Sequence, residues 1–481
     1  MDWNLINLDA DSATPLYLQL CSSLTEAIKT GKLEPGDQLP SERKLAGLLA
    51  ISRTTAVNAY EELEARGLVR SYVGRGTFIS ARPDRLGAQF AWRGKVSPLI
   101  QRHLGPDIRA LLASNKPQMI SFSAGQPAYE YFPVERFLAV TESRLRSQPR
   151  DTLGFLPAEG HPYLRECIAT REGVRHEEVM IVAGTQQALD LIARCLIYPQ
   201  DRVVMDWPGY LGAIQSFQFS GAVLSGWDMT LADLDELEDS LIKHRPKLLY
   251  LNPSFQNPTA CTLSLETRQG IIDLARKYRT PIVEDEAYRD LYFATEPPPS
   301  LFELEGSGLV LYIRSLSKTF APGLRLGYIV ADEAIIDQLA LVKAQGDLFT
   351  PGLSQLALAD LLTNGVYDNY LKLLRLKHQE RARVMEASLQ EAFPEGLSWQ
   401  KSQGGLYIWA QLHHLESGEL LAEATKAGVS FMPGSSFFFE PGGKRALRLC
   451  YSGTEPEAIR SGVERLKRAY NQALGMSGFS L

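Results

Sequence analysis

The sequence predicts a multidomain α/β protein, and three observations support this prediction. The chain has 481 residues, and at about 150 residues per domain that length suggests roughly three domains. Its 45% apolar and 22% charged residues are ordinary for a folded globular chain, which excludes collagen-like, disordered and coiled-coil classes. Residues 1–80 show short helices followed by a hairpin pattern, whereas residues 179–330 alternate apolar strands with helical stretches.

The first 80 residues predict three helices and one hairpin. The elements are a helix over Pro15–Thr30, a helix from its cap Ser41 to Leu49 with Leu45, Leu48 and Leu49 inward, a helix from its cap Ser52 to about Arg66, and strands Leu68–Tyr72 and Thr77–Ile79. Two helices joined by a tight turn and followed by a hairpin form a winged helix-turn-helix. The alternative is a small helical interaction module whose polar face is merely solvated.

The third helix begins with side chains that suit a DNA groove. Arg53, Thr54 and Thr55 occupy its first turn, and Asn58 lies one turn further on. These side chains donate hydrogen bonds to phosphates and base edges. Arg75, at the tip of the predicted hairpin, is placed to reach a neighbouring groove or phosphate.

The order of motifs in this segment resembles the GntR family of bacterial regulators, from about residue 14 to 80. The matching runs are Leu-Glu-Pro-Gly-Asp-Gln-Leu-Pro-Ser-Glu-Arg-Lys-Leu-Ala, then Ile-Ser-Arg-Thr-Thr, then Gly-Arg-Gly-Thr-Phe. The resemblance implies that six positions contact DNA, namely Arg43, Ser52, Arg53, Thr54, Thr55 and Gly74. Asn58 and Arg75 are added on physical grounds alone.

Charge is distributed unevenly along the chain. The net charge of −6 argues, taken whole, against a nucleic-acid partner. Residues 81–118, however, hold seven basic residues against two acidic ones, a net of +5, with several glycines and prolines. This stretch is predicted to be a basic linker, either a solvated tether or one that also touches DNA phosphates.

Seven apolar runs in the second half predict a mostly parallel sheet with helices between most strands. They are Val179–Ala183, Arg202–Asp206, Ala222–Leu224, Lys247–Leu251, Pro281–Glu284, Leu309–Ile313 and Leu326–Val330. Ligands bind beyond the carboxyl ends of such strands, so the chemistry is expected there.

Polar residues suited to one kind of cofactor follow these strands. Lys318 is a candidate for a Schiff base with an aldehyde, because a partly desolvated amine near a cation has a lowered pKa. Ser315, Ser317 and Arg325 suit a phosphate, as does the helix start at Thr185 and Gln186. Asp285 could pair with a pyridine nitrogen, Asn257 and Tyr288 could bond a ring oxygen, and Tyr210 could stack on the ring. The plainer reading of each residue alone is structural.

Together these motifs resemble the fold-type-I aminotransferases that use pyridoxal 5′-phosphate, most closely the aminoadipate and kynurenine branch, over residues 119–475. The resemblance implies that Lys318 links covalently to the cofactor and that the other residues above hold its ring and phosphate. It further implies that Arg448 binds a substrate carboxylate and that Gly125 lies beside the substrate. A large domain of about residues 165–345 and a small domain of about 119–160 and 350–475 are expected.

Two positions depart from the family pattern. Phe155 stands where aminotransferases usually have a tyrosine that donates to the cofactor phosphate across the dimer, and phenylalanine cannot donate. Ala260 replaces the usual glycine after Asn-Pro-Thr. Neither change blocks cofactor binding, but both bear on turnover.

A GntR-like head, a linker and an aminotransferase-like body resemble the MocR subfamily of transcription regulators. That resemblance implies a homodimer, head to tail, in the cytoplasm, which binds double-stranded promoter DNA and senses an amino-acid or amine effector, or the cofactor itself. The alternative is a working aminotransferase that carries a regulatory DNA-binding domain. Five scattered cysteines predict no metal site, and no apolar run predicts a membrane span.

Overall fold

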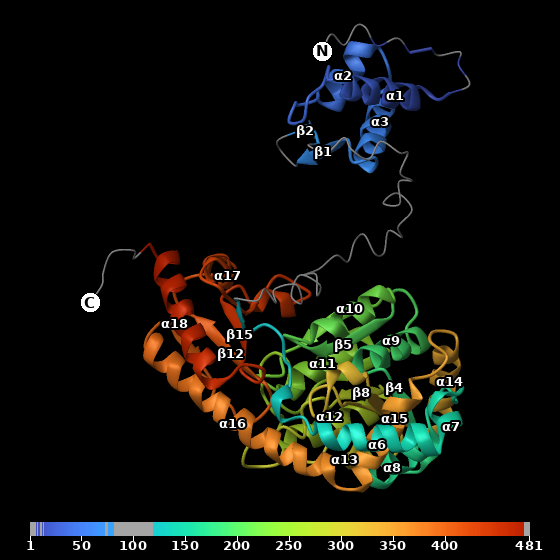
Figure 1. Ribbon diagram of the computed structural model, residues 1–481, viewed down its shortest axis with the longest axis vertical. Helices are drawn as coiled ribbons and strands as arrows, with labels where there is room; N and C mark the ends of the chain where they lie inside the picture. The colour runs from blue at the N-terminus through green and yellow to red at the C-terminus, as the bar shows by residue number, and fades with distance from the viewer. Residues whose placement is uncertain are drawn as a thin grey trace. The chain divides into compact units, whose positions relative to one another are not determined.

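The computed structural model describes residues 6, 8–9, 12, 14–72, 76–80 and 119–475. The chain divides into two compact units, one within residues 1–102 and the other within residues 103–481 (Figure 1). The predicted linker 81–118 and the hairpin-tip positions Gly74 and Arg75 lie outside the described residues. No helix of the described parts is both long and apolar enough to cross a membrane.

The first unit is a three-helix bundle with a hairpin, as the sequence predicts. Its elements are α1 (Leu16–Lys29), α2 (Glu42–Leu49), α3 (Arg53–Ala65), β1 (Val69–Tyr72) and β2 (Gly76–Ile79). Ser41 and Ser52 cap α2 and α3 through their hydroxyls. The antiparallel register pairs Val69 with Ile79. Leu20, Leu24, Leu45, Leu63 and Ile79 are fully buried or nearly so in one apolar core.

One prediction for α2 is wrong. Leu45 is buried, but Leu48 is 41% exposed and Leu49 is only partly buried. Three residues after Leu45, Leu48 should share its face, yet the helix has only eight residues and Ala46 takes the second buried position. Because α2 is short and packs against two longer helices, the stripe of its surface that is buried is narrower than the sequence pattern suggests.

The second unit is built on a seven-stranded sheet in the order β4-β10-β9-β8-β7-β5-β6. Its strands are β4 (Val179–Val182), β5 (Arg202–Asp206), β6 (Val223–Trp227), β7 (Leu248–Leu251), β8 (Ile282–Asp285), β9 (Val310–Ser315) and β10 (Gly327–Val330). All seven predicted strands are present. Only β10 runs antiparallel to its neighbours, so the sheet is mostly parallel.

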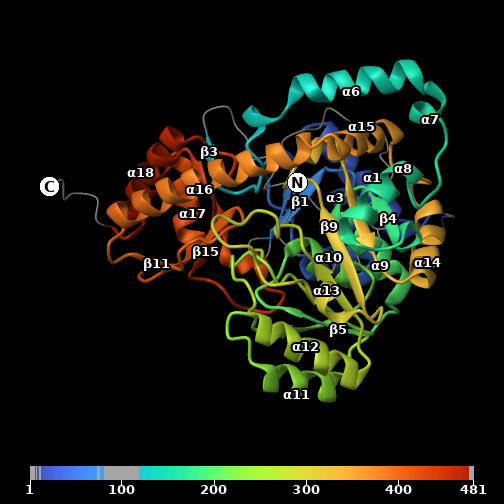
Figure 2. The same cartoon turned by 90° about the horizontal axis from the view of Figure 1, so that it is seen from below.

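Helices cover both faces of this sheet (Figures 1 and 2). One face carries α9 (Thr185–Leu196), α10 (Leu211–Phe219) and α14 (Glu333–Ala344). The other carries α8 (Pro162–Glu172), α11 (Leu234–His244), α12 (Leu265–Tyr278), α13 (Leu301–Glu305), α15 (Gly352–Thr363) and α16 (Val366–Ala392). Side chains alternate along each strand, so that Ile181 faces α8 while Met180 and Val182 face α9. Both faces are apolar, as expected for a buried parallel sheet.

A smaller antiparallel sheet, in the order β11-β12-β15-β14, lies beside the C-terminal half of α16 (Figure 2). Its strands are β11 (Leu397–Trp399), β12 (Tyr407–Leu412), β14 (Met432–Pro433) and β15 (Ala446–Cys450), and it packs with α17 (Ser417–Lys426) and α18 (Pro456–Ala473). The short strand β3 (Ile120–Ser121) pairs with β13 (Val429–Ser430). The peripheral helices α6 (Val134–Ser147) and α7 (Pro149–Leu153) complete the unit.

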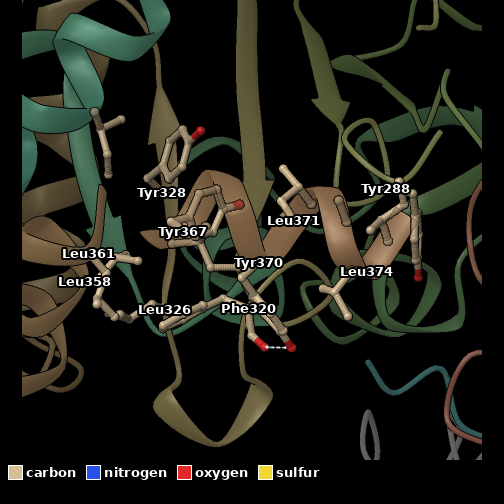
Figure 3. Packing of buried hydrophobic residues seen from close by; sticks show 14 of the residues in the cluster. Tyr288, Phe320, Leu326, Tyr328, Leu358, Leu361, Tyr367, Tyr370, Leu371 and Leu374 are labelled. Carbon is tan, nitrogen blue, oxygen red and sulfur yellow. Dashed lines mark hydrogen bonds between the residues drawn. The ribbon is translucent and has the colours of Figure 1, made fainter. Parts of the chain in front are cut away.

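The core cluster shown in Figure 3 packs against the loop that follows β9. Tyr367, Tyr370, Leu371 and Leu374 of α16 form a stripe that packs toward Phe320 in the loop after β9. The Tyr370 hydroxyl lies 3.5 Å from the Phe320 carbonyl oxygen (Figure 3). The apolar core therefore fixes the loop that carries Lys318.

Candidate functional site

A cavity of about 150 Å³ opens at the carboxyl ends of the strands of the large sheet. The residues that line it come from segments far apart in sequence: Thr185, Gln186, Tyr210, Asn252, Asn257, Asp285, Ala287, Tyr288, Ser315, Ser317, Lys318, Pro322 and Arg325. Every cofactor-binding residue that the sequence predicts is in this set. Strand topology brings them together, because β4, β5, β7, β8 and β9 end at the same edge.

Lys318 follows β9 by three residues, and its side chain turns into the cavity. Its Nζ donates to the Gly125 carbonyl oxygen at 2.7 Å. Burial is the main reason that the pKa of this amine falls to about 8, with Arg448 and Arg325 lowering it further. The next residue is held by Tyr367, whose hydroxyl donates to Thr319 Oγ1 at 2.9 Å. A lysine with this pKa is partly neutral near pH 8 and can act as a nucleophile.

Asp285 is the last residue of β8 and is 3% exposed. Its carboxylate accepts hydrogen bonds from the Tyr250 hydroxyl at 3.0 Å and from the Ala287 amide at 3.2 Å. Burial raises the pKa of Asp285 to about 7. A buried carboxyl group of this kind is stabilised in its charged form by a cation, such as a protonated ring nitrogen.

Asn257, Tyr288 and Arg448 form one hydrogen-bonded group. Asn257 Nδ2 donates to the Tyr288 hydroxyl at 3.2 Å. Arg448 Nη1 donates to Asn257 Oδ1 at 2.6 Å, and its Nη2 donates to the Ser123 carbonyl at 2.6 Å. The Nε of Arg448 is buried and has no partner among the described residues. One edge of this guanidinium is therefore available to a carboxylate.

A second group of cavity residues is rich in hydrogen-bond donors. Thr185 is the first residue of α9, and its buried hydroxyl has no hydrogen-bond partner within the described chain. Ser315 and Ser317 line the same cavity. Arg325 reaches the Ala183 carbonyl just before the helix start. Hydroxyls, a guanidinium and a helix N-terminus together suit a phosphate group.

The structure shows what the side chains of Gln186 and Tyr210 contact, which their sequence motifs do not indicate. Gln186 Nε2 donates to Ser216 Oγ at 2.8 Å, so its side chain is engaged with α10 and its backbone amide is the group left for an anion. Tyr210 lies directly before α10. A Cβ on Gly212 would lie 2.5 Å from the Tyr210 ring, so this glycine leaves room for the ring at the cavity wall.

The predicted DNA-contacting residues gather at the start of α3 and on α2. Arg43, Ser52, Arg53, Thr54 and Asn58 are exposed, and Thr55 is half-buried. Ser52 Oγ accepts from the Thr55 amide at 3.0 Å and lies 2.8 Å from its hydroxyl, so these two side chains also cap the helix.

The two departures from the family pattern have clear positions. Phe155 is 89% exposed, and its ring lies 5.8 Å from that of Phe349 rather than in the cavity lining. Ala260 has a φ of +60°, the left-handed region in which an alanine is strained and a glycine is not.

Three residues near the cavity were missed by the sequence reasoning. Asn252 directly follows β7, so its place at a strand end was a usable signal. Tyr250 reads as an ordinary core residue of a buried strand, yet it donates to Asp285. Tyr407, on the small sheet, lies 3.1 Å from Tyr288 through its hydroxyl, and no local motif marks it.

These residues fit pyridoxal 5′-phosphate. The fit rests on an amine with a lowered pKa, a buried carboxyl group, an unpartnered Thr185 hydroxyl and an unpartnered Arg448 Nε, all at or beside one cavity. Among the described residues no group of three or more potential ligands could hold a metal ion.

Comparison with known proteins agrees with this chemistry. Residues 117–466 match the family model of aminotransferase class I and II, and residues 16–79 match that of bacterial regulatory proteins, gntR family. A 2-aminoadipate transaminase of Thermus thermophilus is 38% identical over 77% of this chain and 94% of its own. The crystal structure of the α-aminoadipate aminotransferase LysN from that organism, complexed with N-(5′-phosphopyridoxyl)-L-leucine, superposes with a TM-score of 0.77. It is 36% identical and covers 80% of this chain and all of its own.

Relatives that match along nearly the whole chain are regulators. The probable rhizopine catabolism regulatory protein MocR of Rhizobium meliloti is 30% identical over 98% of this chain and 97% of its own. An uncharacterised HTH-type transcriptional regulator, YisV of Bacillus subtilis, is 31% identical over 94% of this chain and 95% of its own. The chain therefore belongs to the aminotransferase class I and II family and, within it, to the MocR-type regulators, which join a GntR helix-turn-helix domain to an aminotransferase-like domain that uses pyridoxal 5′-phosphate.

Proposed function

We propose that this protein is a promoter-binding regulator whose aminotransferase-like unit senses an amino-acid or amine effector through cofactor bound at Lys318. The observation that carries the proposal is a single cavity that combines a reactive lysine, a buried acid and unpartnered donors, in a chain that also presents the polar start of α3 on a winged helix. The same cavity could respond to the cofactor alone, but Arg448 would then have no evident use.

Bound pyridoxal 5′-phosphate supplies an aldehyde that reacts with amines and an electron-poor ring. Lys318 would hold it covalently, and Asp285 would face the ring nitrogen. Asn257 and Tyr288 would bond the ring oxygen while Tyr210 covers one ring face. Thr185, Ser315, Ser317, Arg325 and the backbone at Gln186 would hold the phosphate.

Arg448 is the proposed site for the effector carboxylate. Its free Nε and its two Nη atoms can form a bidentate pair with a carboxylate. A carboxylate bound there would compete with the bonds that Arg448 makes to Asn257 and to the Ser123 carbonyl. Ser123 and Gly125 follow the predicted linker within a few residues of sequence, so an effector that changes these bonds acts on the segment to which the linker is joined.

DNA binding would use Arg43, Ser52, Arg53, Thr54, Thr55 and Asn58, with Gly74 and Arg75 added from the wing. The exposed positions at the start of α3 support this assignment. An effector shifts the DNA-binding equilibrium only through a difference in its affinity for the two states.

A head-to-tail homodimer in the cytoplasm is part of the proposal. Three large apolar side chains support a covered face on the second unit, because Leu153 is 71%, Phe155 89% and Leu348 56% exposed. Leu153→Lys with Leu348→Lys should shift the sedimentation coefficient toward that of a monomer. An unchanged coefficient would place the dimer contact elsewhere.

A working aminotransferase is the second candidate. The complete set of cavity residues favours it, as does the pKa of about 8 for Lys318. Phe155 offers no donor to a phosphate, which weighs against rapid turnover.

One experiment separates the two candidates. Cofactor-loaded protein is tested for binding to its own promoter fragment and to random DNA of equal length, with and without a panel of amino acids. A promoter preference that an amino acid alters supports the regulator. Equal binding to both DNAs, together with steady transamination at more than about 1 s⁻¹, would establish the enzyme instead.

A further inference from the structure

Tyr407 lies next to three residues at or beside the cavity, namely Tyr288, Arg448 and Gly125. The function proposed above does not use Tyr407 itself. It is the first residue of β12 and is 2% exposed. Its hydroxyl oxygen is 3.1 Å from that of Tyr288, and the two rings meet edge to face with centroids 5.7 Å apart. Tyr407 therefore contacts the residue expected to bond the ring oxygen.

The ring of Tyr407 also supports Arg448. The guanidinium carbon of Arg448 lies 4.1 Å from the centroid of the Tyr407 ring and 4.8 Å from that of Phe437. On paired strands β12 and β15, Tyr407 is opposite Cys450, so Arg448 is its diagonal neighbour. Two aromatic rings thus hold the guanidinium of Arg448, a residue that is 6% exposed, and the attraction between the charge and the ring quadrupoles favours this arrangement.

The third neighbour is Gly125. A Cβ at this position would lie 2.1 Å from the Tyr407 hydroxyl oxygen, so only a glycine leaves the tyrosine its place. The carbonyl of Gly125 accepts the hydrogen bond from Lys318. The titratable or charged groups around Tyr407 include Tyr288, Arg448 and Cys450, and also Tyr210 and Tyr451.

We propose that Tyr407 is a positioning residue with two separable actions, in which its hydroxyl orients Tyr288 toward the cofactor ring and its ring holds Arg448 ready for a carboxylate. This inference rests on the proposed use of the cavity. When Tyr288 donates its proton to the ring oxygen, Tyr407 has to be the donor between the two hydroxyls. A donated bond makes Tyr288 the stronger donor in turn.

Two substitutions at Tyr407 separate the two actions. Tyr407→Phe removes the hydroxyl but keeps the ring under Arg448, whereas Tyr407→Leu removes both. Phe437→Leu is the matched control, because it removes the other aromatic ring that packs on Arg448. It leaves Tyr407 in place, and with it the hydrogen bond and the ring contact between Tyr407 and Tyr288. All proteins are loaded with cofactor, and thermal unfolding first verifies that each variant is folded.

The first measurement is the pH midpoint of the visible absorbance of the Lys318–cofactor linkage, which needs no effector. A weaker donor at the ring oxygen stabilises its negative charge less, which favours the protonated linkage. We therefore expect a midpoint roughly 0.3 pH units higher in Tyr407→Phe and Tyr407→Leu, and an unchanged one in Phe437→Leu. Identical midpoints in the wild type and in Tyr407→Phe would overturn the first action.

The second measurement is the concentration of L-2-aminoadipate that gives half of the absorbance change. We expect it to rise about fivefold or more in Tyr407→Leu and in Phe437→Leu, but to stay near the wild-type value in Tyr407→Phe. Equal values in all four proteins would overturn the second action. If no amino acid changes the wild-type spectrum, the proposed effector fails, while the pH midpoint still decides the first action.

Discussion

The two units of this chain place the residues proposed for their functions in opposite environments. In the aminotransferase-like unit Asp285, Arg448 and Tyr288 are nearly inaccessible to solvent, and each is held by a named hydrogen bond. In the winged helix the corresponding residues, such as Arg53 and Asn58, are exposed on a helix surface. Burial shifts pKa values and fixes geometry, whereas exposure leaves charge available to a partner. Substitutions in the aminotransferase-like unit should therefore alter chemistry, and those in the winged helix should alter salt-dependent affinity.

The largest expected effect comes from Lys318→Ala. Without this amine no covalent link to the cofactor can form, so the absorbance of the Lys318–cofactor linkage should vanish, and borohydride reduction should no longer fix the cofactor to the chain. Lys318→Arg is the matched control, because it keeps a cation but not the nucleophile, and it should lack the linkage as well. Cofactor that reduction still fixes to either variant would show that another lysine holds it.

Asp285→Asn should come next. An amide cannot carry the charge that pairs with a protonated ring nitrogen, and charged hydrogen bonds contribute about 1.5–3 kcal/mol. Cofactor affinity, measured by equilibrium dialysis, should fall about tenfold or more. The control is Asp206→Asn, since burial also raises the pKa of Asp206 to about 7 but this residue does not line the cavity. Equal losses in both variants would indicate a general effect of buried acids.

The lowered pKa of Lys318 predicts a pH dependence with a defined sign. Only the neutral amine attacks an aldehyde, so the rate of cofactor attachment to apoprotein should rise about tenfold from pH 7 to 9 and then level off, as follows from a pKa of about 8. Stopped-flow absorbance measures this rate. A rate that keeps rising up to pH 10 would mean that the amine of Lys318 has an ordinary pKa. Burial would then not have changed the chemistry of this residue, contrary to the contrast drawn between the two units.

Arg53→Ala tests the exposed side of the comparison. Loss of one contact should weaken promoter binding roughly fivefold, and a phosphate contact would also reduce the salt slope by about one. Fluorescence anisotropy at several salt concentrations measures both quantities. The control is Arg66→Ala, because Arg66 lies at the other end of α3 and pairs with Glu62 at 2.9 Å. Cofactor absorbance should not change in either variant.

The sequence predicts which residues gather at the buried site, but it does not predict the side-chain contacts among them. The proposed cofactor residues follow apolar strands, and parallel strands end at one edge, so the sequence alone allows Lys318, Asp285 and Thr185 to be grouped. Tyr407 could not, because it reaches the site from another sheet and reads locally as core. Leu48 shows the same limit in the winged helix, where its spacing predicts burial but the width of a short helix leaves it exposed. Local pattern predicts elements and their ends, whereas side-chain contacts depend on how the elements pack.

The smallest expected effect concerns the backbone of the buried unit. Ala260 has a φ of +60°, which costs an L-residue about 1–2 kcal/mol, partly offset in glycine by its greater flexibility when unfolded. Ala260→Gly should therefore raise the free energy of unfolding by about 0.5–1 kcal/mol, measured by urea denaturation of apoprotein. Ala427→Gly, at a φ of −76°, should instead lower it. Cofactor affinity and DNA binding should stay constant in Ala260→Gly, because the strain is local to the turn after Asn257. A stability gain that also shifted DNA affinity would mean that the strain is not local and that the turn after Asn257 takes part in the coupling between the cavity and the winged helix.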